Sequence, residues 1–248
     1  MRTLFTGQQL ILRDVVDSTN NYAASLVQSD NIPEGAVIMA REQTMGRGQR
    51  GTQWQSVAGE NLTFSLVYYP RFLAAQDQFM LSRICALALL ETLLSMEVQA
   101  SIKWPNDLLV NGKKICGVLI ENGIQGDRLS SAVIGIGLNV NQLVFPGGIS
   151  ATSLALERKA QFDLIHVLGS FCERMEKWYL LLRQGKNELI CKQYLQCLMN
   201  FREWSWFQKE ENPFKAMITD VNREGKLELT LENGKIQTFG LKEIRQVI

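Results

Sequence analysis

The hydrophobic positions in the first hundred residues form short strand-like runs and one long helical run. Residues 9–16, 36–41 and 61–69 are apolar or alternating, which predicts strands. Residues 77–96 repeat apolar side chains at helical spacing and predict a buried helix. The Asp-Ser-Thr sequence at 17–19 offers side-chain oxygens suited to the start of a short helix.

The middle of the chain predicts consecutive strands joined by tight turns. Residues 103–110 lead into Asn111-Gly112, a dipeptide typical of a two-residue hairpin, and residues 115–121 return. A further strand is expected at 131–140. Adjacent hairpins favour a mixed or antiparallel sheet over a doubly wound parallel one.

The last third changes from helical to strand-like patterning. Residues 161–184 and 186–199 predict two helices. From about Pro213, short runs around a second Asn-Gly turn predict a small separate β-barrel. We therefore expect an α+β chain with a main domain at 1–199 and a β domain at 200–248.

Composition restricts the class of protein. The chain has 248 residues, 46% of them hydrophobic, which is enough for one large and one small domain without disulfides. The net charge of +1 gives no sign of a nucleic-acid or membrane partner. Five cysteines without a CxxC pair fit a reducing cytoplasm. The most apolar run, residues 84–94, is too short to span a bilayer.

A polar, glycine-rich stretch at 43–60 contains the sequence GRGQRG at 46–51. It matches the letters GxGxxG, but residues 52–56 lack helical periodicity, so a dinucleotide-binding Rossmann loop is disfavoured. Glycines allow close backbone approach, and the guanidinium groups of Arg47 and Arg50 suit phosphate oxygens. We predict a loop that orders around an anion. A solvated surface turn is the simpler alternative.

The second group of candidate residues is the KWPND sequence at 103–107 together with Lys114. The hairpin can bring Lys103 and Lys114 onto neighbouring strands, and two ammonium groups lie close together only if an anion lies between them. Asp107 could bind magnesium through oxygen. An edge hairpin with surface lysines is the alternative.

The third group is the GIGLNVN sequence at 135–141. Glycines within an apolar strand usually mark the close approach of a ligand or another backbone. Asn139, at the strand end, could donate and accept hydrogen bonds. A bulge followed by a turn is the alternative.

Together, these segments resemble the biotin protein ligases in order and spacing. The matching segments are Asp17 to Asn20, Gln43 with residues 46–51 and Trp54, Lys103 to Asp107, Lys114 to Glu121, and Gly135 to Asn139. One such motif is weak, but five in register are specific. The resemblance implies a mixed sheet packed with helices, as in class II aminoacyl-tRNA synthetases, plus a small C-terminal SH3-like β-barrel.

The resemblance also implies residue roles. Biotin would be surrounded by Ser18, Thr19, Asn20, Gln43, Arg47, Gly48, Gln49, Lys114 and Gly117. ATP and the adenylate would be bound by Arg50, Gly51, Thr52, Trp54, Asn106, Asn139, Thr152 and Ser153. Catalysis would depend on Lys114, Lys103, Arg47 and Arg50, with Mg²⁺ at Asp107.

The implied function is a cytoplasmic ligase that converts biotin and ATP to biotinyl-5′-AMP and transfers biotin to a lysine of a biotin carboxyl carrier protein. The first matching strand begins near residue 9, so we expect the short form without an N-terminal DNA-binding domain, and no DNA or membrane partner. Monomer and homodimer both stay open. The alternatives are a lipoate or octanoate ligase, and a non-catalytic biotin- or carrier-binding module.

The chain departs from the family pattern at two positions. Gln49 and Thr52 stand where members often have basic residues. We expect a weaker hold on the adenylate, since one charge-assisted hydrogen bond contributes about 1.5–3 kcal/mol.

Overall fold

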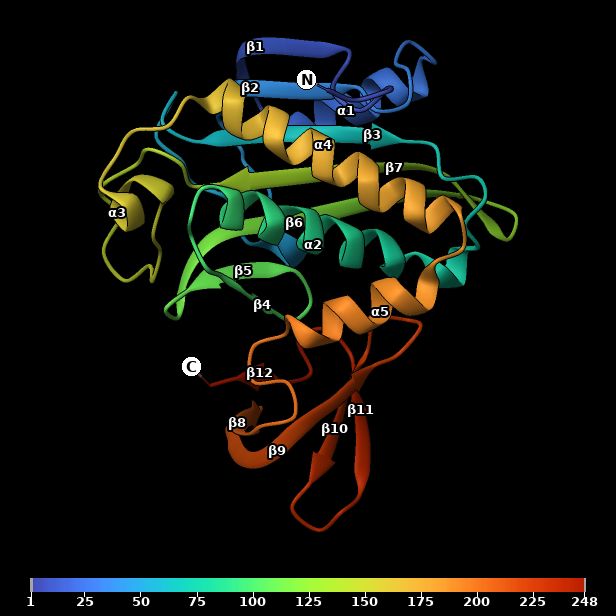
Figure 1. Ribbon diagram of the computed structural model, residues 1–248, viewed down its shortest axis with the longest axis vertical. Coiled ribbons are helices and arrows are strands. Elements are labelled where there is room, and N and C mark those ends of the chain that lie inside the picture. Colours follow the sequence, from blue (N-terminus) through green and yellow to red (C-terminus); the bar gives the residue numbers. More distant parts are fainter. Residues whose placement is uncertain (1, 248) are drawn as a thin grey trace.

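The computed structural model describes residues 2–247, except for the side chain of Arg50. A seven-stranded sheet forms the larger part, in the order β1-β2-β3-β7-β6-β5-β4 (Figure 1). Its strands are β1 (Leu10–Val16), β2 (Val37–Gln43), β3 (Leu62–Tyr68), β4 (Ser101–Lys103), β5 (Asp107–Val110), β6 (Lys113–Gln125) and β7 (Arg128–Leu138). Among these described strands, only β1 and β2 pair in parallel, so the expected mixed sheet is confirmed.

Helices cover both faces of this sheet, which explains why β3 is buried along its whole length. The helices are α1 (Thr19–Gln28), α2 (Phe79–Ser95), α3 (Leu154–Arg158), α4 (Leu164–Arg183) and α5 (Asn187–Gln196), with short 3₁₀ turns at Gln49–Gly51 and Ala75–Asp77. Figure 1 shows α2 and α4 lying across one face. Since side chains alternate along a strand, Val67 faces α1 on the other side while Leu66 faces the main core.

Helix α2 has no polar stripe because neighbours surround it. The apolar run at 84–94 was expected to be too short to span a bilayer, but the whole segment Ala75–Ser95 is long and apolar enough to do so. In the structure, 67% of its apolar stretch is buried. Such burial is typical of a core helix.

Two local expectations were wrong. Residues 103–110 are not one strand: a turn that contains a cis Trp104–Pro105 peptide bond separates β4 from β5. Strand β5 therefore lies between the strands that carry Lys103 and Lys114. At α1, the N-cap Ser18 makes no side-chain capping bond. Instead, the Thr19 N–H donates to Gln43 Oε1 at 2.7 Å.

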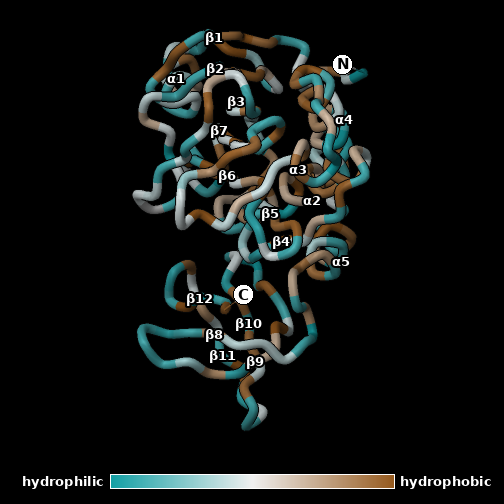
Figure 2. Tube along the Cα trace, turned by 90° about the vertical axis from the view of Figure 1, so that its left-hand side faces the viewer, coloured by the Kyte–Doolittle hydropathy of each residue, from teal (hydrophilic) through white to brown (hydrophobic). Residues whose placement is uncertain are grey.

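A second, five-stranded antiparallel sheet follows, in the order β11-β10-β9-β8-β12. Its strands are β8 (Trp204–Lys209), β9 (Asn212–Val221), β10 (Leu227–Leu231), β11 (Ile236–Phe239) and β12 (Arg245–Gln246). It begins earlier than the expected Pro213, because Trp204 and Trp206 occupy outward positions of β8 and disguise the alternation. Figure 2 shows this sheet as a smaller lobe beyond α5.

The two lobes are joined by a turn between β9 and β10. The buried Arg83 of α2 donates to the carbonyls of Val221 at 2.6 Å and Asn222 at 2.9 Å. Trp104 Nε1 donates to the carbonyl of Gly225 at 3.0 Å. A Cβ at Gly225 would overlap the ring of Phe79. This turn positions the small sheet against the end of the large one.

Candidate active site

The sequence motifs meet at a cavity of about 230 Å³ above β6 and β7. All the residues expected around biotin line it: Ser18, Thr19, Asn20, Gln43, Arg47, Gly48, Gln49, Lys114 and Gly117. Thr52, Trp54 and Asp107 line it too. Residues far apart in the sequence are therefore brought together as the motifs predicted.

The glycines of β7 make room for the cavity's own side chains. A Cβ at Gly135 would overlap the amide of Asn20, and one at Gly137 would overlap the indole of Trp54. The sequence predicted that a ligand or another backbone would approach these glycines closely, but in the structure side chains of the chain itself do so. The approach of a ligand stays a prediction.

The wall formed by α1 is a connected set of polar groups. The Thr19 N–H and hydroxyl both donate to Gln43 Oε1, at 2.7 and 3.0 Å. The Ser65 hydroxyl lies 2.6 Å from Asn20 Oδ1 and 2.7 Å from Thr19 Oγ1. Thr19, Asn20 and Ser65 are buried, so these bonds fix the side-chain orientations.

The glycine-rich segment, residues 46–54, folds over the cavity as a tight hairpin that we call the cover. The Gly48 N–H donates to Thr52 O at 2.7 Å, and the Trp54 N–H donates to Gly46 O at 3.0 Å. Gln49 Nε2 donates to Asn106 Oδ1 at 2.8 Å and to Val118 O at 3.1 Å. The Arg50 side chain lies outside the described part, and Gly51 is exposed.

Cationic groups gather at one end of the cavity. Lys114 Nζ lies 2.8 Å from Asp107 Oδ1. Burial lowers the pKa of Lys103; Asp107 opposes this shift, while the charges of Lys114 and Arg245 add to it. Asp107 thus pairs with Lys114, and its charge also acts on Lys103. A larger cleft between the lobes, lined by Lys103 and Arg245, shares Asp107 and Lys242 with the cavity.

A metal would find few protein ligands here. Among residues 2–247, no group of three or more His, Cys, Asp or Glu side chains is placed to hold one. Asp107 is paired with Lys114. Mg²⁺ commonly binds through one or two carboxylates plus substrate phosphates, so the site fits a metal that arrives with a nucleotide.

Four of the expected nucleotide-binding residues make internal bonds. Asn106 Nδ2 donates to Ser82 at 2.7 Å, and Asn139 Nδ2 donates to Thr152 O at 3.0 Å. The Thr152 hydroxyl donates to Glu157 at 2.6 Å, and Ser153 caps α3. Separate backbone bonds of Lys114 with Ser150 and Thr152 hold this segment beside the start of β6. Their contact with adenine stays a prediction.

Sequence reasoning missed Lys242, which lines the cavity from the small sheet. No local motif marks it, because it follows β11 and reaches the site only through the docking of the lobes. Gln53, Thr63, Leu119 and Ile136 also line the cavity. Leu119 and Ile136 lie within matched segments, Gln53 lies beside Trp54, and Thr63 lies on β3.

The fold and site together define a member of a ligase family. Residues 12–139 match the model of the biotin/lipoate A/B protein ligase family, and the chain belongs to that family.

Several relatives are similar to the chain. It is 37% identical to the bifunctional ligase/repressor BirA of Bacillus subtilis over 184 residues, which is 72% of this chain and 56% of that protein. The chain thus spans little more than half of that relative. It is 32% identical to the biotin--[acetyl-CoA-carboxylase] ligase of Mycobacterium tuberculosis, covering 71% of this chain and 67% of that one.

A solved structure extends the likeness to both lobes. The biotin protein ligase from Aquifex aeolicus in complex with biotin and ATP superposes with a TM-score of 0.80 at 26% identity. The match covers 97% of this chain and 100% of the Aquifex aeolicus chain.

Proposed function

We propose that this chain is an ATP-dependent biotin protein ligase that acts on a biotin carboxyl carrier domain. The observation that carries the proposal is the convergence of the expected biotin-binding residues on one cavity beneath the glycine-rich cover. Similarity to proteins named as biotin ligases supports it.

The proposed reaction has two steps. The biotin carboxylate attacks the α-phosphorus of ATP, which forms biotinyl-5′-AMP and releases pyrophosphate. Two anions must meet, so the protein supplies positive charge and alignment through Lys114, Lys103 and Arg50 of the cover. Arg47 is paired with Glu121 and would add its charge once that pair opens. The carrier lysine amine then attacks the acyl carbon and releases AMP. No enzyme nucleophile is needed.

The cover has a specific task in this scheme. The acyl phosphate of biotinyl-5′-AMP is sensitive to water, and a closed cover excludes solvent until the amine arrives. Trp54 would pack beside the adenylate. Mg²⁺, carried by the ATP phosphates near Asp107, would neutralise the departing pyrophosphate.

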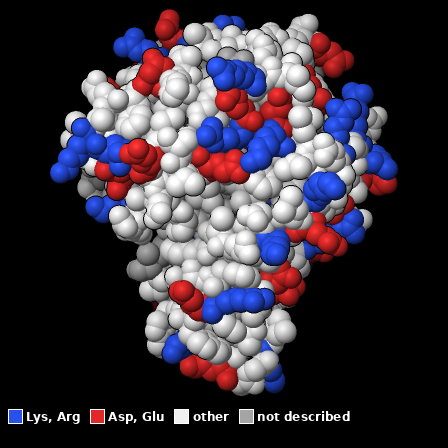
Figure 3. Space-filling model, viewed as in Figure 1, with Lys and Arg blue, Asp and Glu red and all other residues white. Residues whose placement is uncertain are grey.

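The remaining assignments have indirect support. The antiparallel small sheet and its order support an SH3-like barrel and a domain boundary near residue 200. Acidic and basic side chains are interspersed on the face shown in Figure 3. This mixed charge does not favour a DNA or membrane partner. The free cysteines support a cytoplasmic location. Monomer and homodimer are both compatible with the proposal.

The test is transfer of labelled biotin to a purified carrier domain in the presence of ATP and Mg²⁺. The wild-type chain should label the carrier, and Lys114→Ala and Arg47→Ala should label it much more slowly. Unlabelled biotin should compete, and lipoate and octanoate should not. Competition by lipoate or octanoate alone would assign the chain to the lipoate-type ligases. Binding of biotin without transfer would indicate a non-catalytic module.

A further inference from the structure

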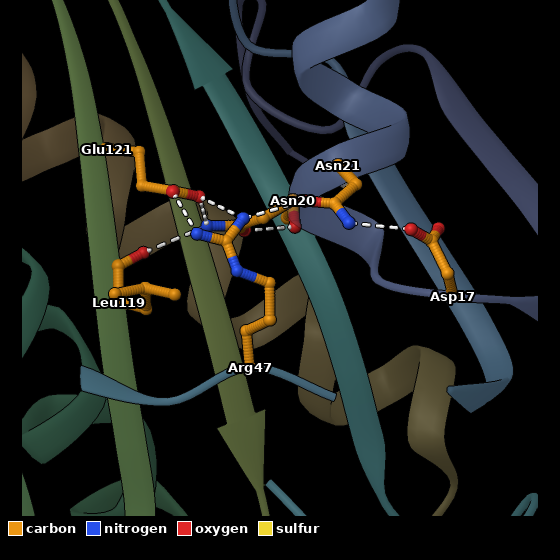
Figure 4. A network of polar contacts seen from close by, with 7 residues as sticks. Asp17, Asn20, Asn21, Arg47, Leu119 and Glu121 are labelled. Carbon is orange, nitrogen blue, oxygen red and sulfur yellow. Dashed lines mark hydrogen bonds and ion pairs between the residues drawn. The ribbon is translucent and has the colours of Figure 1, made fainter. Parts of the chain in front are cut away.

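The guanidinium of Arg47 is bound by groups outside the cationic end of the cavity. Its Nη2 donates to Glu121 Oε1 at 2.5 Å, and its Nη1 donates to Asn21 Oδ1 at 2.6 Å and to Glu121 Oε2 at 3.3 Å. Figure 4 shows the guanidinium reaching from the cover to β6 and α1. Its charge is matched by a bidentate carboxylate contact.

The same carboxylate also holds the cavity wall. Asn20 Nδ2 donates to Glu121 Oε2 at 2.8 Å, while Asn20 Oδ1 lies against Ser65. Asn20 is buried, whereas the side chains of Arg47 and Glu121 are 43% and 37% exposed. Glu121 therefore connects a fixed residue of the wall to a residue of the cover that solvent can reach.

The position of Glu121 on β6 explains how one residue reaches both groups. Strand β5 pairs with β6 only as far as Cys116, and within the described residues no strand continues the sheet on that side beyond it. The cover occupies this side instead, with Gln49 bonded to Val118 O. Arg47 and Gln49 thus attach the cover to β6 at two points.

We propose that Glu121 is a positioning residue, a carboxylate latch that holds the cover closed and orients Asn20. The latch acts in the protein without ligand. Retention of an acyl-adenylate under the closed cover would follow from it, and that consequence rests on the proposed function. Because both partners are partly exposed, salt screens the pair and the latch opens readily.

Trypsin reports the latch directly, since cleavage after Arg47 requires its guanidinium to leave Glu121. We expect cleavage at Arg47 to be about fivefold faster in Glu121→Gln than in wild type, as fits the loss of a partly exposed ion pair. Glu91→Gln is the matched control, because it removes the pairing of Glu91 with Lys177 on the helical face. Asn21→Ala, which removes one acceptor of Arg47, should give a smaller increase.

Salt separates a latch from general loosening. Cleavage rates are normalised to a reference peptide. NaCl at about 0.5 M screens charges strongly, so it should accelerate cleavage of wild type and leave the cleavage rate of Glu121→Gln unchanged. Equal cleavage of wild type, Glu121→Gln and Asn21→Ala at low salt would overturn the latch, as would an equal salt response. A wild-type chain that forms no adenylate from biotin and ATP would instead overturn the proposed function and leave the tryptic result standing.

Discussion

At the scale of residues, the site depends on glycines that leave space as much as on the side chains that fill it. Gly135 and Gly137 lie on the face of β7 that receives Asn20 and Trp54. The indole nitrogen of Trp54 is buried and has no hydrogen-bond partner among residues 2–247 as described. A buried N–H without a partner is costly, which suits a group that contacts a ligand.

Replacing Gly137 by alanine should displace Trp54. The added methyl group would overlap the indole, so the cover cannot close in its present position. We expect adenylate formation to fall by about 100-fold, as is typical of small displacements in active sites. Gly147→Ala is the control and should leave adenylate formation unchanged, because its methyl group meets no atom within 4 Å. Equal activity of wild type and Gly137→Ala would contradict this account of Trp54.

The sequence predicted which residues line the cavity but not how they are joined. Glycine spacing and the KWPND and GRGQRG motifs predicted a common site, and part of each lines the cavity: Arg47 to Gln49, Asp107, and Gly135 to Gly137. The pairing of Arg47 with Glu121 could not be predicted, because it joins segments that lie far apart in the chain. Lys114 and Asp107 lie on one predicted hairpin, but their pairing depends on its register, which shifts between Leu108 and Leu109.

At the scale of elements, boundary errors had local causes. The turn after Lys103 interrupts an apolar run that reads as one strand, and outward tryptophans disguise the start of β8. The N-terminal segment before β1 was not assigned any structure. It is held by Glu176 of α4, which accepts from the N–H groups of Leu4, Phe5 and Thr6.

Glu176→Gln should therefore release this segment and make stability less sensitive to acid. Burial favours the neutral form, but the backbone N–H donors outweigh it and lower the pKa of Glu176 below its usual 4.5. Its stabilisation is present above the unfolded pKa and lost as pH falls through the lower folded pKa. We expect a loss of about 1–3 kcal/mol near neutral pH, measured by urea unfolding.

The control for this prediction is Glu173→Gln, which removes one exposed contact with the Arg2 N–H. Between about pH 5 and pH 3, wild type should lose more stability than Glu176→Gln. Parallel stability curves for the two proteins across that range would show that the carboxylate is not ionised in its present contacts.

At the scale of the whole molecule, the small sheet contributes to the site through its docking. Lys242 lines the cavity, and Arg245 contributes to the low pKa of Lys103. Both positions depend on the turn held by Arg83. Nothing in a local sequence pattern links these residues, so the junction could not be predicted.

Arg83→Met should loosen the small sheet while keeping an apolar side chain on α2. The carbonyls of Val221 and Asn222 lose their donor, which should cost about 2–4 kcal/mol in unfolding experiments. ATP affinity should fall as well, because Lys242 and Arg245 are no longer held at the cleft. Lys226→Ala, which removes an exposed pair with Glu224 inside the same turn, should change both little. Equal ATP affinity in Arg83→Met and wild type would show that the small sheet does not contribute to nucleotide binding.

The most direct measurement of the central claim is exchange of labelled pyrophosphate into ATP. It requires only biotin, ATP and Mg²⁺, and it reports reversible adenylate formation in the cavity. We predict exchange that depends on biotin and falls by at least about 100-fold in folded Lys114→Ala. The account would be contradicted by a folded wild-type chain that shows no biotin-dependent exchange, or by exchange that persists unchanged without Lys114.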